Sequence, residues 1–316
     1  MQLSLIFFGS DIYSTTALQH IIDNQSTAKI DNITIITDRP KPVGKDRTLT
    51  LSQVENIAIR QNLKVSYYPN NPDEKIIFIN LLENTKKAGK MLGLCASFDH
   101  LIPTDIISIF AGDLYNLHPS LLPQYRNVSP VQYAIALGDT TTGITLFRIS
   151  PSIDDGEIIA QAQEPILPDD TTPTLTPRLF KKGAYLFLQM IQGSELCLPT
   201  HKNKVPNLVF TKRLKKDSGF VEWPALQKLL NDQPITADDT QNELLLLRLT
   251  NNPQGLILSD LLRALTPWPG VWSLVPTKKG ELRITLISNS GSLIPDILIA
   301  GKPNPINISD FTRYYF

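Results

Sequence analysis

The sequence predicts an α/β protein with a mostly parallel, doubly wound sheet, followed by a smaller β-rich domain. Short continuous apolar runs alternate with stretches of helical spacing between residues 3 and 186, which is typical of parallel strands joined by helices. A polar, basic and proline-bounded stretch follows at residues 199–207. Beyond it, short strand-like runs are separated by turns, which favours a small β-barrel.

The first strand is predicted at residues 3–8, where a continuous apolar run is closed by Gly9. Such a run indicates a parallel strand that is buried on both faces. Residues 38–47 contain two prolines and a glycine, so a loop without regular structure is expected there. The remaining elements alternate, with strands at 33–37, 64–68, 90–96 and 113–118 and helices around 17–22, 52–62, 74–85 and 104–110.

The next segment begins with a helix, for which Ser129 is the expected N-cap and Pro130 the first residue. Two strands follow at 143–149 and 157–163, read as antiparallel neighbours. A helix over residues 175–186 comes next, with Pro177 tolerated in its first turn.

The predicted domains are 1–200, a basic linker at 201–208, and 209–316. The last of these contains strand-like runs at 220–223, 271–275, 282–287 and 297–299.

The composition excludes disordered and fibrous proteins. Hydrophobic residues make up 42% and charged residues 19% of the chain, as in ordinary globular domains. Thirty basic residues balance thirty acidic ones, so net charge gives no argument for nucleic acid. Cys95 and Cys197 lie far apart without a CxxC pair, which supports neither a zinc site nor a disulfide framework. No metal is therefore expected. No signal peptide or membrane-spanning run is recognised, so a cytoplasmic protein is expected.

One polar triplet stands out at predicted strand ends, where α/β sheets bind ligands. Asn116 and His118 are two apart on a strand and leave the same face, and Asp154 lies in the turn between the strands predicted at 143–149 and 157–163, which could fold back towards them. An amide and an imidazolium can stabilise an oxyanion in acyl transfer, with the carboxylate keeping the imidazole charged and oriented. The alternative is an interior histidine, a turn-forming Asn and a solvent-facing Asp, and spacing alone favours it.

Gly9 lacks the companion glycines of a dinucleotide-binding motif, so this Rossmann-like layout implies no nucleotide cofactor.

Several motifs, in order, resemble those of the folate-dependent formyltransferases. They are residues 116–123 with Arg126 and Pro130, residues 142–145, and residues 154–156. Residues 8–10, 37–45, 267–269 and 301–302 extend the likeness over nearly the whole chain, towards the branch that formylates methionyl-tRNA. The resemblance implies 10-formyltetrahydrofolate as co-substrate, initiator methionyl-tRNA as acceptor in translation initiation, and a C-terminal OB-like domain that binds tRNA. A monomer is expected.

The resemblance assigns roles to particular residues. His118 would be the polarising acid, Asn116 an oxyanion donor and Asp154, the first residue of Asp-x-Gly, the group that orients His118. The adjacent Asp155 is the competing choice. The expected folate-binding residues are Ser120, Leu121, Leu122 and Pro123.

Ten basic residues are the expected tRNA contacts: Arg39, Lys41, Lys45, Arg47, Lys202, Lys204, Lys212, Arg213, Lys215 and Lys216. Lys and Arg side chains bind phosphates in a salt-sensitive way. The alternative is a solvated loop and a solvated linker.

The chain departs from the family pattern at Pro119, Asn127 and Asp11. Pro119 fixes its own φ and biases His118 towards an extended backbone, and Asn127 tolerates the left-handed conformation that glycine would supply. Two alternatives stay open, the first because sugar formyltransferases share the Asn, His and Asp trio, the second because of these departures. One is a formyltransferase acting on an amino sugar nucleotide, and the other is a non-catalytic descendant that binds tRNA or folate.

Overall fold

The computed structural model describes residues 2–44, 46–194, 208–254, 257–278, 280–287 and 295–315. The chain divides into two compact units, the first made of Met1–Arg126, Gly143–Glu164 and Thr176–Pro206, the second of Asn127–Thr142, Pro165–Leu175 and Asn207–Phe316. The predicted linker at 201–208 lies almost entirely outside the described residues, so that boundary stays a prediction. The sequence did not indicate that two short internal segments belong with the second unit.

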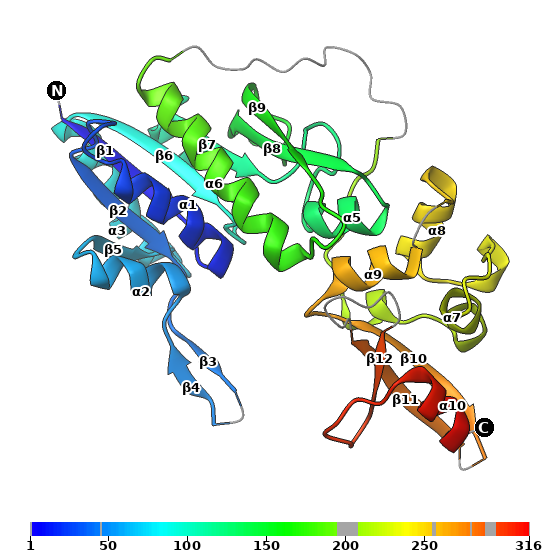
Figure 1. Ribbon diagram of the computed structural model, residues 1–316. Coiled ribbons are helices and arrows are strands. Elements are labelled where there is room, and N and C mark those ends of the chain that lie inside the picture. The colour runs from blue at the N-terminus through cyan, green and yellow to red at the C-terminus, as the bar shows by residue number, and fades with distance from the viewer. Residues whose placement is uncertain are drawn as a thin grey trace. The chain divides into compact units, whose positions relative to one another are not determined.

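A seven-stranded sheet in the order β5-β2-β1-β6-β7-β8-β9 organises the first unit (Figure 1). Its strands are β1 (Leu3–Phe8), β2 (Asn32–Thr37), β5 (Lys64–Tyr67), β6 (Lys90–Ala96), β7 (Leu114–His118), β8 (Thr141–Arg148) and β9 (Ile158–Pro165). The pairs β1–β2, β1–β6, β2–β5 and β6–β7 are parallel, and β7–β8 is antiparallel. The predicted α/β fold with a mostly parallel sheet is confirmed.

Helices cover both faces of this sheet (Figure 1). They are α1 (Ile12–Asp23), α2 (Gln53–Arg60), α3 (Pro72–Ala88), α4 (Thr104–Ile109) and α6 (Thr172–Ile191). Leu114 of β7 shares a buried cluster with Phe78 of α3. The next residue, Tyr115, contacts Phe187 of α6 with ring centroids 6.1 Å apart. Because successive residues of a strand face opposite sides, α3 and α6 cover opposite faces.

Short polar side chains fix the starts of three helices, since Asp11, Ser52 and Asn71 each accept a hydrogen bond from the N–H three residues on. Helix α5 (Pro130–Ala136) differs from the expectation. Pro130 is its first residue as predicted, but Ser129 has a left-handed backbone (φ 67°) and its side chain makes no capping bond. Helix α6 begins at Thr172, which puts Pro177 in the second turn rather than the first.

The prediction of an irregular loop at residues 38–47 is wrong. An antiparallel ribbon of β3 (Lys41–Val43) and β4 (Thr48–Thr50) forms there and extends away from the sheet of the first unit (Figure 1). Pro42 pairs with Leu49 in this hairpin. Proline is tolerated because both strands of an isolated ribbon are edges, so a residue without an N–H can face solvent.

The second unit contains a three-stranded antiparallel sheet, β10 (Val271–Thr277), β11 (Gly280–Ile287) and β12 (Asp296–Ile299), which agrees with the predicted small β domain. Its further helices are α7 (Trp223–Leu230), α8 (Glu243–Asn251), α9 (Ile257–Leu265), α10 (Ile308–Tyr315) and the 3-10 turns η1 (Lys216–Gly219) and η2 (Ala237–Asp239). The strand expected at 220–223 is absent from this described stretch: Phe220 makes one bridge to Trp272, and Trp223 begins α7.

A buried arginine explains why α5 belongs with the second unit. Arg248 is 2% exposed, donates to the Leu137 carbonyl at the end of α5 and pairs with Asp260 of α9 at 3.0 Å. A Cβ at Gly138 would lie 1.5 Å from this guanidinium. Removing Asp260 would leave the buried Arg248 charge without its ionic partner, whereas Asp260 also pairs with Arg263 at 2.6 Å. Through its bond to the Leu137 carbonyl, Arg248 joins α5 to the second unit.

Candidate active site

Strand β7 presents Asn116 and His118 on one face. Leu117, like Tyr115, faces the other side, since a Cβ at Gly183 of α6 would lie 3.1 Å from Leu117. His118 is 4% exposed. Asn116 is half-buried, and its side-chain amide makes no hydrogen bond to the described part of the chain. The amide N–H is therefore open to a ligand oxygen near the end of the strand.

The His118 imidazole lies between two hydrogen-bond acceptors. Its Nε2 is 2.8 Å from the Tyr125 carbonyl oxygen, and its Nδ1 is 3.5 Å from Oδ2 of Asp154. Nε2–H donates to the carbonyl, which leaves Nδ1 to exchange a proton beside the carboxylate.

Burial is the largest influence on this imidazole and lowers the pKa of His118 below its ordinary value. The Asp154 charge and the Tyr125 carbonyl raise the pKa of His118 without overcoming burial, and Arg126 lowers it further. This differs from the expectation that Asp154 keeps the imidazole charged. The site favours the neutral ring.

The loop between β8 and β9 separates the two adjacent carboxylates. Asp154 faces His118 and adopts a left-handed backbone, with φ 47°. Asp155 instead pairs with Arg126, whose Nη2 lies 2.7 Å from Oδ1 of Asp155. Of the two choices that the sequence offered, the structure brings Asp154 to the imidazole.

Gly156 allows this loop to approach β8. A Cβ there would lie 1.7 Å from the Arg148 carbonyl oxygen, so only glycine fits, which gives the Asp-x-Gly motif a steric reason. We expect Gly156→Ala to lower the free energy of unfolding by about 1–3 kcal/mol, the usual cost of overpacking, and to displace Asp154 from His118. Urea unfolding measures the loss beside Ser152→Ala, an exposed position of the same loop. Equal stability of the two variants would contradict this explanation.

Residues 120–123 are braced against the last two strands of the sheet. Thr145 of β8 donates from Oγ1 to the Ser120 carbonyl (2.6 Å) and accepts from the Leu122 N–H (3.1 Å). Gln161 of β9 donates to the Leu122 carbonyl at 2.8 Å. The Leu121 N–H makes no hydrogen bond within the described residues. Sequence reasoning missed Thr145 and Gln161 as positioning residues, although both lie on predicted strands.

Two of the family departures are accommodated locally. Strand β7 continues through His118 as expected, and the Ser120 N–H donates to the His118 carbonyl at 2.8 Å. This bond spans Pro119, whose fixed φ suits such a tight turn. Asn127 has φ 85°, the left-handed conformation expected for it.

The predicted tRNA contacts of the first unit lie on and beside the β3–β4 hairpin. Arg39, Lys41 and Arg47 are all exposed, and Lys45 lies outside the described residues. Two of them have acidic partners, Glu74 for Arg39 and Asp38 for Lys41, each at 2.8 Å. The Arg39–Glu74 pair is largely exposed, and such pairs contribute little, so it leaves Arg39 open to a phosphate.

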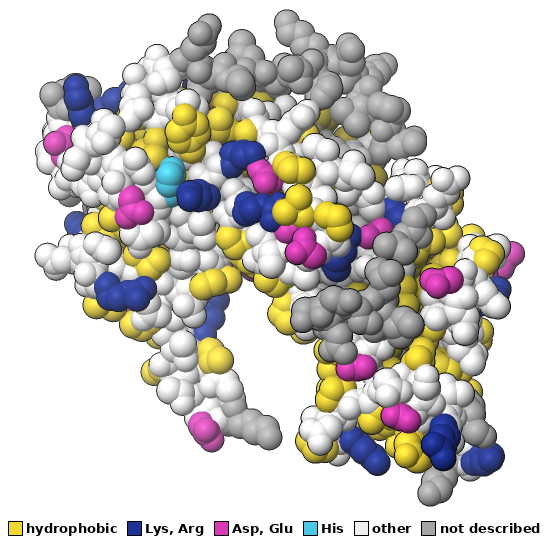
Figure 2. Space-filling model, in the orientation of Figure 1, with side chains coloured by type: hydrophobic (Ala, Val, Ile, Leu, Met, Phe, Trp, Pro, Cys, Tyr) yellow, Lys and Arg dark blue, Asp and Glu magenta, His cyan; other side chains and the backbone are white. Residues whose placement is uncertain are grey.

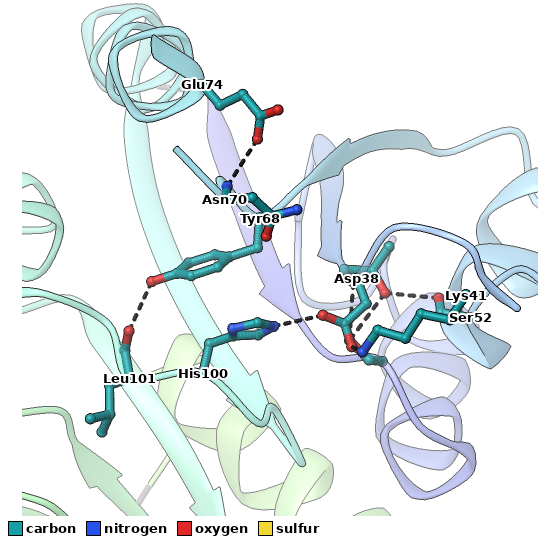
Figure 3. Close-up of polar contacts among 10 residues, drawn as sticks. Asp38, Lys41, Ser52, Tyr68, Asn70, Glu74, His100 and Leu101 are labelled. Carbon is teal, nitrogen blue, oxygen red and sulfur yellow. Dashed lines mark hydrogen bonds and ion pairs between the residues drawn. The ribbon is translucent and has the colours of Figure 1, made fainter. Parts of the chain in front are cut away.

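Asp38, at the base of this hairpin, binds both Lys41 and His100 (Figure 3). His100, which follows β6, reaches Asp38 with Nε2 at 2.6 Å, and Lys41 binds the same carboxylate. Burial raises the pKa of Asp38, but the hydrogen bonds from Lys41 and His100 outweigh burial and hold this pKa below its ordinary value. The His100 ring also lies 4.7 Å from that of Tyr68. The hairpin is therefore anchored where it leaves the sheet.

In the second unit, the described predicted tRNA contacts are all exposed: Lys212, Arg213, Lys215 and Lys216. Lys212 pairs with Glu243 at 2.8 Å. Lys202 and Lys204 fall in the stretch that is not described. On the face drawn in Figure 2, basic side chains stand among acidic ones rather than forming one continuous patch.

Across the described ranges, no cluster of three or more His, Cys, Asp or Glu side chains could hold a metal ion. In that same portion of the chain, none of the helices has the length and apolar character needed to cross a membrane. Cys95 is buried and free, and burial raises the pKa of its thiol; Cys197 is not among the described residues.

Comparison with known proteins places this geometry in a family. Residues 3–191 match the formyl transferase family. The chain is 25% identical over 302 residues to the methionyl-tRNA formyltransferase of Thermodesulfovibrio yellowstonii, covering 96% of this chain and 86% of the relative. A protein of the same name from Chloroflexus aggregans is 30% identical over 225 residues, 70% of this chain and 69% of the relative.

Among solved structures, the N-formyltransferase of Helicobacter canadensis, in complex with folinic acid and dTDP-3-aminofucose, has a TM-score of 0.53 at 19% identity and covers 91% of this chain and 89% of its own. That likeness is one of fold. The family match extends over more than half of the chain and includes β7 and the loop that carries Asp154. The chain therefore belongs to the formyl transferase family.

Proposed function

We propose that this protein transfers the formyl group of 10-formyltetrahydrofolate to the amino group of initiator methionyl-tRNA for translation initiation, acting as a monomer in the cytoplasm. The observation that carries the proposal is the placement of His118 between the Tyr125 carbonyl and Asp154. Asn116 lies on the same strand face, and its amide makes no hydrogen bond to any described residue. Relatives named methionyl-tRNA formyltransferase, matched over most of the chain, support this choice of acceptor.

The geometry supports a proton relay through His118. When the amine attacks the formyl carbon, negative charge develops on the formyl oxygen and the Asn116 amide stabilises it. The proton that the amine releases passes to Nδ1 of His118, the nitrogen that faces Asp154 at 3.5 Å. The adduct then collapses, the bond from the formyl carbon to the folate N10 nitrogen breaks, and the imidazolium returns the proton to that nitrogen. His118 is thus a base first and an acid second.

Residues 120–123 fit a folate co-substrate, which supplies the formyl group. Thr145 and Gln161 already hold the Ser120 and Leu122 backbone groups, so the segment is shaped before the ligand arrives. The Leu121 N–H, which has no partner among the described residues, can donate to a polar atom of the ligand. No step of the relay needs a metal.

The acceptor is tested by giving the protein 10-formyltetrahydrofolate with either initiator methionyl-tRNA or a dTDP-linked amino sugar. The proposal predicts formylmethionyl-tRNA and no formylated sugar. Formylation of the sugar alone would make the protein a sugar nucleotide formyltransferase. Binding of tRNA or folate without formyl transfer would make it a non-catalytic descendant. Either result overturns the proposal.

The basic hairpin is expected to contribute to tRNA binding. If Arg39 and Arg47 contact phosphates, replacing either with alanine should raise KM for methionyl-tRNA, leave kcat unchanged, and reduce the slope of log affinity against log salt by about 1. The matched control is Lys64→Ala, because Lys64 is an exposed cation at the start of β5. Equal salt slopes for all variants and the wild type would exclude the hairpin from the tRNA interface.

A further inference from the structure

The two loops that flank His118 are joined by an ion pair that the proton relay does not use. Tyr125, whose carbonyl accepts from Nε2 of His118, is followed by Arg126. Asp154, which faces Nδ1, is followed by Asp155. Nη2 of Arg126 lies 2.7 Å from Oδ1 of Asp155. One ion pair therefore connects the chain segments that contact both ring nitrogens.

The backbone of these loops gives an independent reason for such a connection. Tyr125 has φ 59° and Asp154 has φ 47°. Left-handed backbone is unfavourable for Tyr125 and is adopted only occasionally by Asp, so the Tyr125 loop above all needs contacts that hold it in place. The side chains of Arg126 and Asp155 are 26% and 53% exposed, and a pair this exposed adds little to global stability. Its effect is therefore local.

We propose that Arg126 and Asp155 form a latch, a pair of positioning residues that fixes the separation of Asp154 from His118 and so governs proton exchange at the imidazole. The latch rests on the proposed role of His118 in formyl transfer. It acts through His118 and Asp154 rather than by touching the reacting atoms.

Two charged side chains act on His118, and the latch bears on both. The Asp154 carboxylate raises the pKa of His118, and the Arg126 guanidinium lowers it. Without Asp155, the Arg126 charge is offset by one carboxylate fewer and acts more strongly on the imidazole, so the pKa of His118 should fall. Without Arg126, the Asp154 charge acts on His118 without the opposing guanidinium, so the pKa of His118 should rise. Charges that act through space alone would also give opposite shifts, so the latch requires that a loss of rate accompany them in both variants.

The test compares Asp155→Asn and Arg126→Gln with Glu157→Gln, which breaks the pair between Arg148 and Glu157 at the base of the same loop. The imidazole of His118 is titrated by NMR in each protein, its signal identified among four histidines by comparison with His118→Asn. We expect the pKa of His118 to move down in Asp155→Asn, up in Arg126→Gln, and not at all in Glu157→Gln.

Rates provide a second readout. Misplacement of Asp154 should lower kcat about 10- to 100-fold in both latch variants, with opposite displacements of the pH–rate profile, while Asp155→Glu retains most of the activity. Shifts of the His118 pKa in one common direction, none in either variant, or opposite shifts without a loss of rate overturn the latch.

The titration needs no substrate, so it can overturn the latch even if the wild type formylates nothing, a result that would instead refute the proposed function. Melting temperatures verify folding, and Asp155→Ser repeats the test if Asp155→Asn does not fold.

Discussion

Replacing His118 with asparagine is expected to lower kcat for formyl transfer by about 10³-fold, within the range that a positioned acid–base group contributes. Asparagine can still donate to the Tyr125 carbonyl, which His118 Nε2 contacts at 2.8 Å, but it cannot take a proton from the amine. Single-turnover kinetics with saturating co-substrate measures the loss directly, because product release does not limit that rate.

The matched control is His20→Asn, the same exchange at a half-buried position of α1. It should keep wild-type kinetics. A His118→Asn variant that folds and turns over at more than about a tenth of the wild-type rate would be incompatible with the relay, since a general base contributes at least about 10²-fold.

The pH dependence follows from the direction of the His118 shift. Burial lowers the pKa of His118 below its ordinary 6.5, so the neutral ring needed as base predominates at neutral pH. The rate should be level there and fall as pH drops through the lowered pKa of His118. Folding stability has the same sign: below pH 6.5 the unfolded chain takes up this proton before the folded one, so the His118 contribution is lost as pH falls.

Replacing Asn116 with alanine is expected to lower kcat about 10²- to 10³-fold, the usual cost of one oxyanion donor, with little change in KM for either substrate. The amide makes no hydrogen bond within the described residues, so its removal should leave the melting temperature nearly unchanged. Asn116→Asp should be slower still, because a carboxylate repels the developing oxyanion. Steady-state kinetics and thermal unfolding together separate catalysis from folding.

Asn56→Ala, at another half-buried asparagine, on α2, is the control for Asn116 and should leave kcat unchanged. Loss of stability in Asn116→Ala, with kcat preserved, would identify the amide as structural rather than catalytic.

Much of the sheet was predictable, because buried parallel strands are continuous apolar runs. The run at 3–8 became β1 (Leu3–Phe8) with the same bounds. The β3–β4 hairpin was missed because two prolines and a glycine in one short stretch usually indicate a chain without regular structure. Pro42 is accommodated because it pairs with Leu49 of the neighbouring strand, and the local sequence does not reveal that pairing.

The sequence also did not predict that α5 packs with the second unit. This packing depends on Arg248 reaching Leu137 from more than a hundred residues away, and local periodicity carries no sign of that contact. Long-range ionic contacts inside a core depend on tertiary packing rather than on neighbouring residues.

The candidate site was visible only in part. Asn116 and His118 stand two apart on a strand, a spacing that fixes their common face. Spacing could not separate Asp154 from Asp155, since the choice depends on the loop backbone that brings one carboxylate within 3.5 Å of the imidazole. The Tyr125 carbonyl was invisible, because a backbone acceptor has no side-chain signature.

The most direct test of the account is a single reaction in which N-formylmethionine released from tRNA and free tetrahydrofolate are both quantified, for the wild type and for His118→Asn. The proton relay predicts equal amounts of the two products from the wild type and almost none of either from the variant. Wild-type protein that forms neither product, or a folded His118→Asn variant that forms both at the wild-type rate, would contradict it.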